Sequence, residues 1–251
     1  MRTLWAYRRI AGLGVAVLAA FYAYITFIAP AVFAPGSNRP SSGAIGALFA
    51  RPFGLTVPHP FCTASVINSK KGNLLLTAAH CLGKVPISQM VFIPYFHNGT
   101  APFGEYSITS QSFPPGWLPG GNITRDYAFL TVSGDVQKKA GAEKLAASTP
   151  LPHDATLEAY DESGGTIVCP AHPQAVTRAG VPQLRIACPG FADASSGGPL
   201  LTRVNPQSRL GTIVAVIGGY EEGGDSSTVS YASFLEPGAI ALAQKLARSG
   251  R

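Results

Sequence analysis

The sequence predicts an all-β fold in two strand-rich halves, followed by one C-terminal helix. Charged residues make up 13% of the 251 residues, well below the roughly 25% usual in soluble domains. The 28 glycines and 21 prolines supply frequent turns. Short apolar runs alternate with turn residues such as Asn98-Gly99, a texture that favours many short strands over long helices. A chain of this length can bury a sizeable core, in one large domain or two small ones.

The strand-like segments fall into two groups along the chain. A polar, alanine-rich stretch at 133–152 separates them and is interpreted as a connector. In the first half, apolar runs lie at 45–49, 61–67, 74–77, 90–95 and 127–132, with 113–123 as a loop. In the second half, strands are expected at 155–160, 166–169, 183–187, 200–203, 212–217 and 228–232.

The C-terminal segment predicts a helix over residues 236–247. Its apolar side chains recur at helical spacing, and Lys245 lies near the end where a positive charge suits the helix dipole. The apolar stripe is formed by Ala239, Leu242, Ala243 and Leu246.

The N-terminus is interpreted as a targeting segment. Arg8-Arg9 precede residues 10–29, an uncharged apolar stretch of about 20 residues, which is long enough to cross a bilayer. The arginines are expected to stay in the cytoplasm, so that the rest of the chain lies outside. We expect a signal peptide or signal anchor at 1–34 and a linker at 35–42. Cleavage after Ala34 is disfavoured by Pro35, and a buried core helix is the alternative.

The net charge of +6 does not indicate nucleic-acid binding. Half of it comes from Arg2, Arg8 and Arg9 in the N-terminal segment, and no basic run with interleaved aromatic residues follows. We therefore expect no nucleic-acid partner. A membrane partner is expected only through the N-terminal segment, if that segment is retained.

Four cysteines in an exported chain predict two disulfides. Three pairings are possible, and we favour the sequential one, Cys62 with Cys81 and Cys169 with Cys188, because each bridge then stays within one half. A zinc site is the competing interpretation, but the sequence has no Cys-x-x-Cys pair.

Three segments carry the residue types that acyl transfer at neutral pH requires, which are a nucleophile, a base and a group that orients the base. They are residues 75–81 (LLTAAHC), 125–130 (RDYAFL) and 194–200 (ASSGGPL). Each alone is compatible with an ordinary structural role. Together, and in this order, they single out His80, Asp126 and Ser196.

Chain order excludes two other hydrolase arrangements. No acidic residue precedes His80, because Glu105 is the first, so the order Asp–His–Ser is impossible. Ala194-x-Ser196-x-Gly198 is similar to a lipase-type nucleophile elbow, but that fold needs a histidine after the serine, and all five histidines precede Ser196.

The TAAHC, DYAF and SGGP elements resemble the chymotrypsin/trypsin-type serine proteases, in particular the bacterial secreted trypsin-like peptidases, over residues 43–237. The resemblance implies two six-stranded antiparallel β-barrels, at 43–135 and within 136–251, with the C-terminal helix after the second. It implies a serine endopeptidase with a polypeptide substrate, no cofactor or metal, a monomeric state, and a secreted or cell-surface location. His80 and Asp126 belong to the first barrel and Ser196 to the second.

The resemblance also assigns finer roles and shows departures. The backbone N–H groups of Ala194 and Ser196 are implied as the oxyanion hole, although glycine is usual at position 194. Ser195 replaces the aspartate that pairs with a new N-terminus in the animal enzymes, so no such activation is expected.

The alternative function is a catalytically weak or inactive binding module, and a structural envelope protein is the third hypothesis. The substrate pocket, expected to be open and to lack an acid at its base, is assigned to Gly190, Ile217, Gly218 and Gly219.

Overall fold

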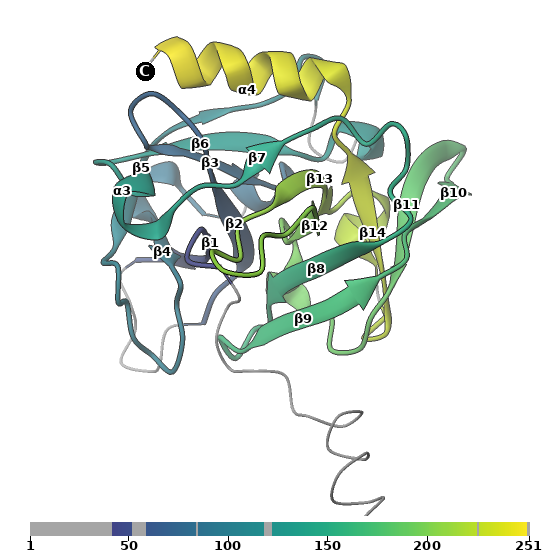
Figure 1. The fold of residues 1–251 in the computed structure, drawn as a ribbon, viewed down its shortest axis with the longest axis horizontal. Helices are drawn as coiled ribbons and strands as arrows, with labels where there is room; N and C mark the ends of the chain where they lie inside the picture. The colour runs from purple at the N-terminus through teal and green to yellow at the C-terminus, as the bar shows by residue number, and fades with distance from the viewer. Residues whose placement is uncertain (1–41, 52–58, 84, 118–121, 225, 250–251) are drawn as a thin grey trace, which may run out of the picture. The chain divides into compact units, whose positions relative to one another are not determined.

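The chain folds into two β-sheets that follow one another along the sequence, and it ends in a helix (Figure 1). The computed structural model describes residues 42–51, 59–83, 85–117, 122–224 and 226–249. The predicted signal or anchor segment at 1–34 lies outside the described residues. Within the described ranges, no helix has the length and apolar composition needed to cross a membrane.

The first sheet is a closed six-stranded barrel, as expected. Its strands follow the order β1-β2-β3-β6-β5-β4, and β1 pairs with β4 to close it. Side chains alternate across the sheet, so that Leu75 points into the barrel core while Leu74 and Leu76 join a second cluster. The strands are β1 (Ile45–Ala50), β2 (Cys62–Ile67), β3 (Leu74–Thr77), β4 (Met90–Pro94), β5 (Tyr106–Ser112) and β6 (Ala128–Val132).

The second sheet differs from the expected six-stranded barrel, because it contains eight strands. Seven follow the order β10-β11-β14-β13-β12-β8-β9, and β7 pairs in parallel with β13. The end strands β9 and β10 each pair with one neighbour only. Pro170 within β9 and Pro173 after it have no N–H to donate to a further strand. The strands are β7 (Lys144–Leu145), β8 (Ala155–Tyr160), β9 (Thr166–Ala171), β10 (Gln174–Arg178), β11 (Val181–Ala187), β12 (Pro199–Thr202), β13 (Thr212–Ile217) and β14 (Val229–Phe234).

Helix α4 (Pro237–Ser249) packs its predicted apolar stripe onto side chains of both sheets. Ala239 and Ala243 are buried in one cluster with Leu76 of β3 and Val216 of β13. The carbonyl of Ala247 accepts a hydrogen bond from the N–H of Lys70 at 3.1 Å, which fixes the end of the helix against the first barrel. The remaining helical segments are short: α3 (Gln137–Ala140), η1 (His80–Gly83), η2 (Ile87–Gln89), η3 (Ile123–Arg125), η4 (Asp193–Ser195) and η5 (Tyr220–Gly223).

Glu143, in the connector between the sheets, is a fully buried acid. One carboxylate oxygen accepts a hydrogen bond from the Ser42 hydroxyl at 2.8 Å, and the other accepts one from the backbone N–H of Gly211. Its backbone N–H donates to Val66 of β2 at 2.9 Å. Burial raises the pKa of Glu143, and the bonds from Gly211 and Ser42 offset part of that rise. The residue thus joins the start of the first barrel, strand β2 and the approach to β13.

We expect the Glu143→Gln protein to gain stability relative to the wild type as the pH rises. A carboxyl whose pKa is raised by folding holds its proton more tightly in the folded state, so its contribution falls as the pH rises above its ordinary pKa of 4.5. Each unit by which folding raises the pKa of Glu143 corresponds to about 1.4 kcal/mol of unfolding free energy. Urea unfolding at pH 4 and pH 7 measures the difference, with Glu105→Gln as the surface control. The prediction is contradicted if the unfolding free energy of Glu143→Gln relative to the wild type stays constant or falls between pH 4 and pH 7.

Candidate active site

His80 and Asp126 form a buried pair held by three hydrogen bonds. The ring Nδ1 of His80 lies 2.6 Å from Oδ2 of Asp126, and the backbone N–H of His80 donates to Oδ1 at 2.9 Å. The backbone N–H of Gly219 donates to Oδ2 at 2.7 Å. Because a carboxylate only accepts hydrogen bonds, Nδ1 carries the proton and Nε2 is left as the acceptor. The side chains are only 9% and 6% exposed, so the pair lies out of bulk water.

The environment of Asp126 favours its charged form. Burial by itself raises the pKa of this carboxyl. The hydrogen bond and charge of the His80 ring, with the backbone N–H groups of Gly219 and His80, outweigh that effect, so the net pKa of Asp126 is lowered. Asp126 is therefore ionised at neutral pH and able to orient the imidazole.

Local structure explains why these two side chains meet. His80 opens η1 after two residues that follow strand β3, and Asp126 follows η3 with one residue between it and β6, the strand that pairs with β3. Asn122 caps η3 by accepting a hydrogen bond from the N–H of Thr124 at 3.2 Å. At Gly219 the backbone has φ +91°, and a Cβ there would lie 2.2 Å from the amide oxygen of Gln183. At the preceding Gly218 a Cβ would lie 2.8 Å from Oδ2 of Asp126, so two successive glycines let this backbone reach the carboxylate.

Ser196 lies at the end of η4, between the two sheets. The next residue, Gly197, has φ +83°, and a Cβ there would lie 2.2 Å from the carbonyl oxygen of Thr63. The N–H of Gly197 donates to the carbonyl of Ile217 at 2.8 Å. The backbone after Ser196 is thus held between β2 of the first barrel and β13 of the second sheet.

Thr63, a fully buried residue of β2, carries the hydrogen bonds that attach this loop to the first barrel. Its hydroxyl donates to the carbonyl of Ala194 at 2.9 Å and accepts from the N–H of Tyr160 at 2.9 Å. Its backbone N–H donates to the carbonyl of Ser196 at 2.8 Å. Its own carbonyl accepts from the hydroxyl of Thr77 at 2.7 Å, three residues before His80. One threonine therefore connects the segments that carry His80 and Ser196.

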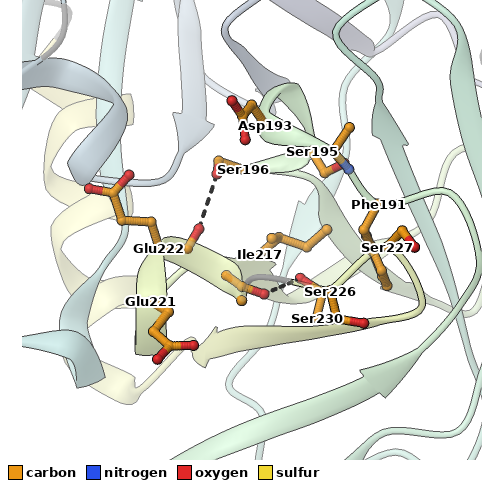
Figure 2. Close-up of a pocket in the computed structure, with 13 residues that line it drawn as sticks. Phe191, Asp193, Ser195, Ser196, Ile217, Glu221, Glu222, Ser226, Ser227 and Ser230 are labelled. Atoms are coloured by element: carbon orange, nitrogen blue, oxygen red, sulfur yellow. Dashed lines mark hydrogen bonds between the residues drawn. The ribbon is translucent and has the colours of Figure 1, made fainter.

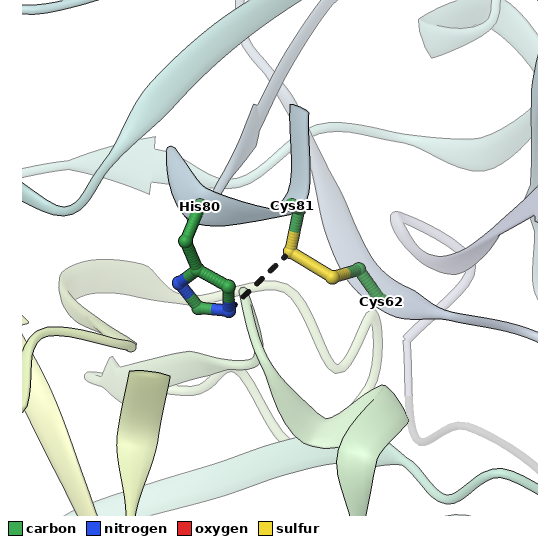
Figure 3. A group of neighbouring side chains, drawn as sticks. All are labelled: Cys62, His80 and Cys81. Atoms are coloured by element: carbon green, nitrogen blue, oxygen red, sulfur yellow. Dashed lines mark hydrogen bonds between the residues drawn. A yellow bond between two sulfur atoms is a disulfide. The ribbon is translucent and has the colours of Figure 1, made fainter. Parts of the chain in front are cut away.

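The hydroxyl of Ser196 donates to the backbone carbonyl of Glu222 at 3.1 Å (Figure 2). The carboxylate of Glu222 lies 4.0 Å from the Nε2 of His80, and the Sγ of Cys81 lies 3.9 Å from it (Figure 3). Both predicted reacting groups thus approach Glu222 of η5. The structure brings His80 and Asp126 into direct contact and places Ser196 beside the same turn, η5.

Two disulfides join the cysteines in the sequential pairing expected from the sequence, Cys62 to Cys81 and Cys169 to Cys188. The first fixes the residue that follows His80 to strand β2 (Figure 3). Its sulfurs are bonded to each other, so they are not thiolates that could bind a metal together with His80.

A cavity of about 350 Å³ opens beside Ser196 (Figure 2). Of the four residues assigned to the substrate pocket, Ile217 lines this cavity, whereas Gly190, Gly218 and Gly219 are not among its lining residues. Gly219 instead bonds Asp126, and Gly190 bonds the carbonyl of Ser227 at 2.8 Å. Three acidic residues line the cavity, and no lysine, arginine or histidine is among its described lining residues. The acids are Asp193, Glu221 and Glu222.

Comparisons with known proteins identify the fold. No protein-family model and no curated protein matches the sequence. The solved structure of the protease Anisep from Arthrobacter nicotinovorans matches with a TM-score of 0.66 and 19% identity, covering 83% of this chain and 98% of that one. A thermostable serine protease, AL20, from an extremophilic microorganism matches with 0.65 and 21%, covering 80% and 96%. A Glu endopeptidase in complex with MPD gives 0.59 and 17%, covering 80% and 89%. The chain therefore has the fold of chymotrypsin-type serine proteases.

We expect Thr63→Val to lower the free energy of unfolding by about 2–5 kcal/mol, because it leaves the carbonyl of Ala194 and the N–H of Tyr160 buried without a partner. Thr63→Ser keeps the hydroxyl and loses one methyl group, which costs about 1 kcal/mol. Urea unfolding of the two variants measures the difference. Equal losses in both would show that packing of the methyl group, and not the hydroxyl, is what matters.

Proposed function

We propose that this protein is a serine endopeptidase in which Ser196 is the nucleophile, His80 the general base and Asp126 the group that orients the base. The observation that carries the proposal is the buried hydrogen bond of 2.6 Å between His80 and Asp126, which leaves Nε2 as an acceptor on the side of Glu222, the residue that Ser196 also contacts. The fold shared with serine proteases supports the same reading.

The proposed reaction has two stages. The Ser196 oxygen attacks a peptide carbonyl while its proton passes to Nε2 of His80, and ionised Asp126 stabilises the imidazolium. The N–H groups of Ala194 and Ser196 are proposed to bind the developing oxyanion. His80 then gives the proton to the leaving amine, and an acyl-enzyme forms. Water activated by His80 cleaves the ester and restores the Ser196 hydroxyl.

The hydrogen bond from Ser196 to Glu222 sets the starting point of this reaction. The hydroxyl must exchange the carbonyl of Glu222 for Nε2 of His80 before it can lose its proton. Such an exchange needs rotation of the Ser196 side chain about its Cα–Cβ bond. Hydrogen bonds of proteases without substrate are often long and tighten only when substrate binds.

A binding module on the same fold is the second candidate, and two observations favour it. The Ser196 hydroxyl is engaged by a backbone carbonyl, and alanine stands at position 194, where glycine is usual in the proteases that the sequence resembles. Such a module would bind a polypeptide at the cavity beside Ser196 without cleaving it.

An active-site probe separates the two candidates. We expect a fluorophosphonate to label the wild type and the Ser107→Ala control, a change on the exposed face of β5, but not Ser196→Ala. Peptide turnover by Ser196→Ala should fall by about 10⁴-fold or more. Wild-type protein that labels no better than Ser196→Ala supports the binding module and rules out the enzyme.

The substrate is proposed to carry an uncharged or cationic side chain at the residue before the cut. Asp193, Glu221 and Glu222 give the cavity beside Ser196 a negative potential that attracts cations and repels acids. The same cavity has serine hydroxyls, such as that of Ser230, for neutral polar contacts.

Selectivity can be measured on peptides that differ only in having lysine, glutamine or glutamate before the cut. We expect kcat/KM for glutamate to be about tenfold or more below that for glutamine, because each carboxylate repels the substrate's charge. Glu222→Gln should narrow this gap, as should added salt, whereas Glu105→Gln on the first barrel should not. Glutamate cleaved as fast as glutamine would refute the proposed substrate class.

Export of the chain remains part of the proposal. Two disulfides are typical of proteins in oxidising compartments outside the cytoplasm. The apolar stretch at 10–29 supplies a signal that directs the chain there, either cleaved or kept as an anchor.

A further inference from the structure

Two histidines and one aspartate converge on the surface at one end of the β8–β9 hairpin. The Oδ2 of Asp154 lies 3.1 Å from Nδ1 of His153, and its Oδ1 lies 3.0 Å from Nδ1 of His172. The Nδ1 of His172 is also 3.4 Å from the carbonyl of His153. One ligand atom from each of the three side chains lies within 4.8 Å of the other two.

The strand register, and not chance proximity of mobile chain ends, brings these residues together. Strands β8 and β9 are antiparallel neighbours (Figure 1), and Ala155 pairs with Ala171. Asp154 directly precedes the first residue of that pair and His172 directly follows the second, so they occupy opposing positions of the extended ladder. The disulfide from Cys169 to Cys188 ties β9 to the segment after β11. The backbone of the cluster is thus held by pairing and by a covalent bridge.

The spacing of the ligand atoms suits a small transition-metal ion. Zinc binds imidazole nitrogen and carboxylate oxygen at about 2.0–2.2 Å, which places tetrahedral ligands about 3.4 Å apart. Each histidine nitrogen lies close to this distance from a different oxygen of Asp154. Small rotations of the exposed side chains bring both nitrogens and one of the oxygens around a single ion. The hydrogen bond to His153, with the charges of both histidine rings and the hydrogen bond to His172, lowers the pKa of Asp154, so that the carboxyl is charged at neutral pH.

The hydrogen bonds among His153, Asp154 and His172 do not by themselves explain why the three side chains converge. The three side chains are 71–92% exposed, and surface contacts of this kind contribute little to stability. Without a metal, both Nδ1 atoms donate hydrogen bonds to the carboxylate; when each ring shifts its proton to Nε2, the two nitrogens and a carboxylate oxygen form a donor set on a single face. Imidazole selects zinc, copper and nickel over magnesium and calcium, which prefer oxygen ligands.

We propose that His153, Asp154 and His172 form a binding site for one Zn²⁺ ion. The ion takes one nitrogen from each histidine and one oxygen from Asp154, and water completes its coordination. It joins the start of β8 to the end of β9 across the hairpin. The sequence analysis expected no metal from the resemblance to serine proteases, and no motif pointed to this cluster, because His172 lies 18 positions after Asp154. The site is separate from His80, Asp126 and Ser196 and does not rest on the proposed function.

Isothermal titration of Zn²⁺ into the full-length Ser196→Ala chain, without a polyhistidine tag, tests the site free of any self-cleavage. We expect one equivalent to bind, and Mg²⁺ to bind far more weakly. His153→Ala and His172→Ala should each weaken Zn²⁺ binding by at least about tenfold, and so should Asp154→Asn, which keeps the side-chain shape. His59→Ala removes an exposed histidine outside the cluster and should leave binding unchanged.

Nuclear magnetic resonance of the histidine rings gives a second readout that does not depend on affinity alone. On addition of Zn²⁺, the ring signals of His153 and His172 should shift while that of His59 stays in place. The proposal is overturned if the three cluster variants bind Zn²⁺ as the parent chain does, or if no binding is detected up to about 1 mM Zn²⁺. Circular dichroism of each variant establishes that lost binding does not reflect lost folding.

Discussion

The hydrogen bonds of Thr63 join the two halves of the chain beside Ser196. Its hydroxyl and its backbone reach Ala194, Ser196 and Tyr160 in the second half, and its carbonyl holds Thr77 close to His80. All of these groups are buried, so each unmade bond would leave a polar atom without water or protein to satisfy it. The relative position of His80 and Ser196 therefore depends on a residue that takes no part in the proposed chemistry.

A second constraint acts from the other side of the site. The carboxylate of Asp126 receives N–H groups from His80 in the first barrel and from Gly219 in the second sheet. The buried charge is compatible with folding only because both halves supply donors to it. Turn η5 follows directly after Gly219, so the same contact that orients the imidazole also sets the start of the segment that lies against Ser196 and lines the cavity.

Local patterns in the sequence predict much of this structure, but contacts over long range do not follow from them. Strands β3, β8 and β13 begin and end where predicted, because each is an apolar run bounded by turn residues. Strand β5 was missed because only Tyr106 and Ile108 are buried within a polar stretch, and β10 because none of its residues is buried. Chain order and motif single out His80, Asp126 and Ser196. They do not predict the role of Thr63, because its partner Ala194 lies 131 positions away. They do not predict the contact of Glu222 with Ser196 either, because the backbone of Glu222 makes it and the residue type does not.

The bridge between Cys62 and Cys81 has a consequence for when the chemistry becomes available. It holds the residue next to the imidazole to strand β2, and it lies outside the hydrogen-bonding network that positions Asp126. Where this bridge is reduced, the chain can bury the same apolar core but lacks the covalent tether beside His80. The placement of the imidazole therefore depends on oxidation of the cysteine pair, which couples the proposed chemistry to the redox state of the surroundings.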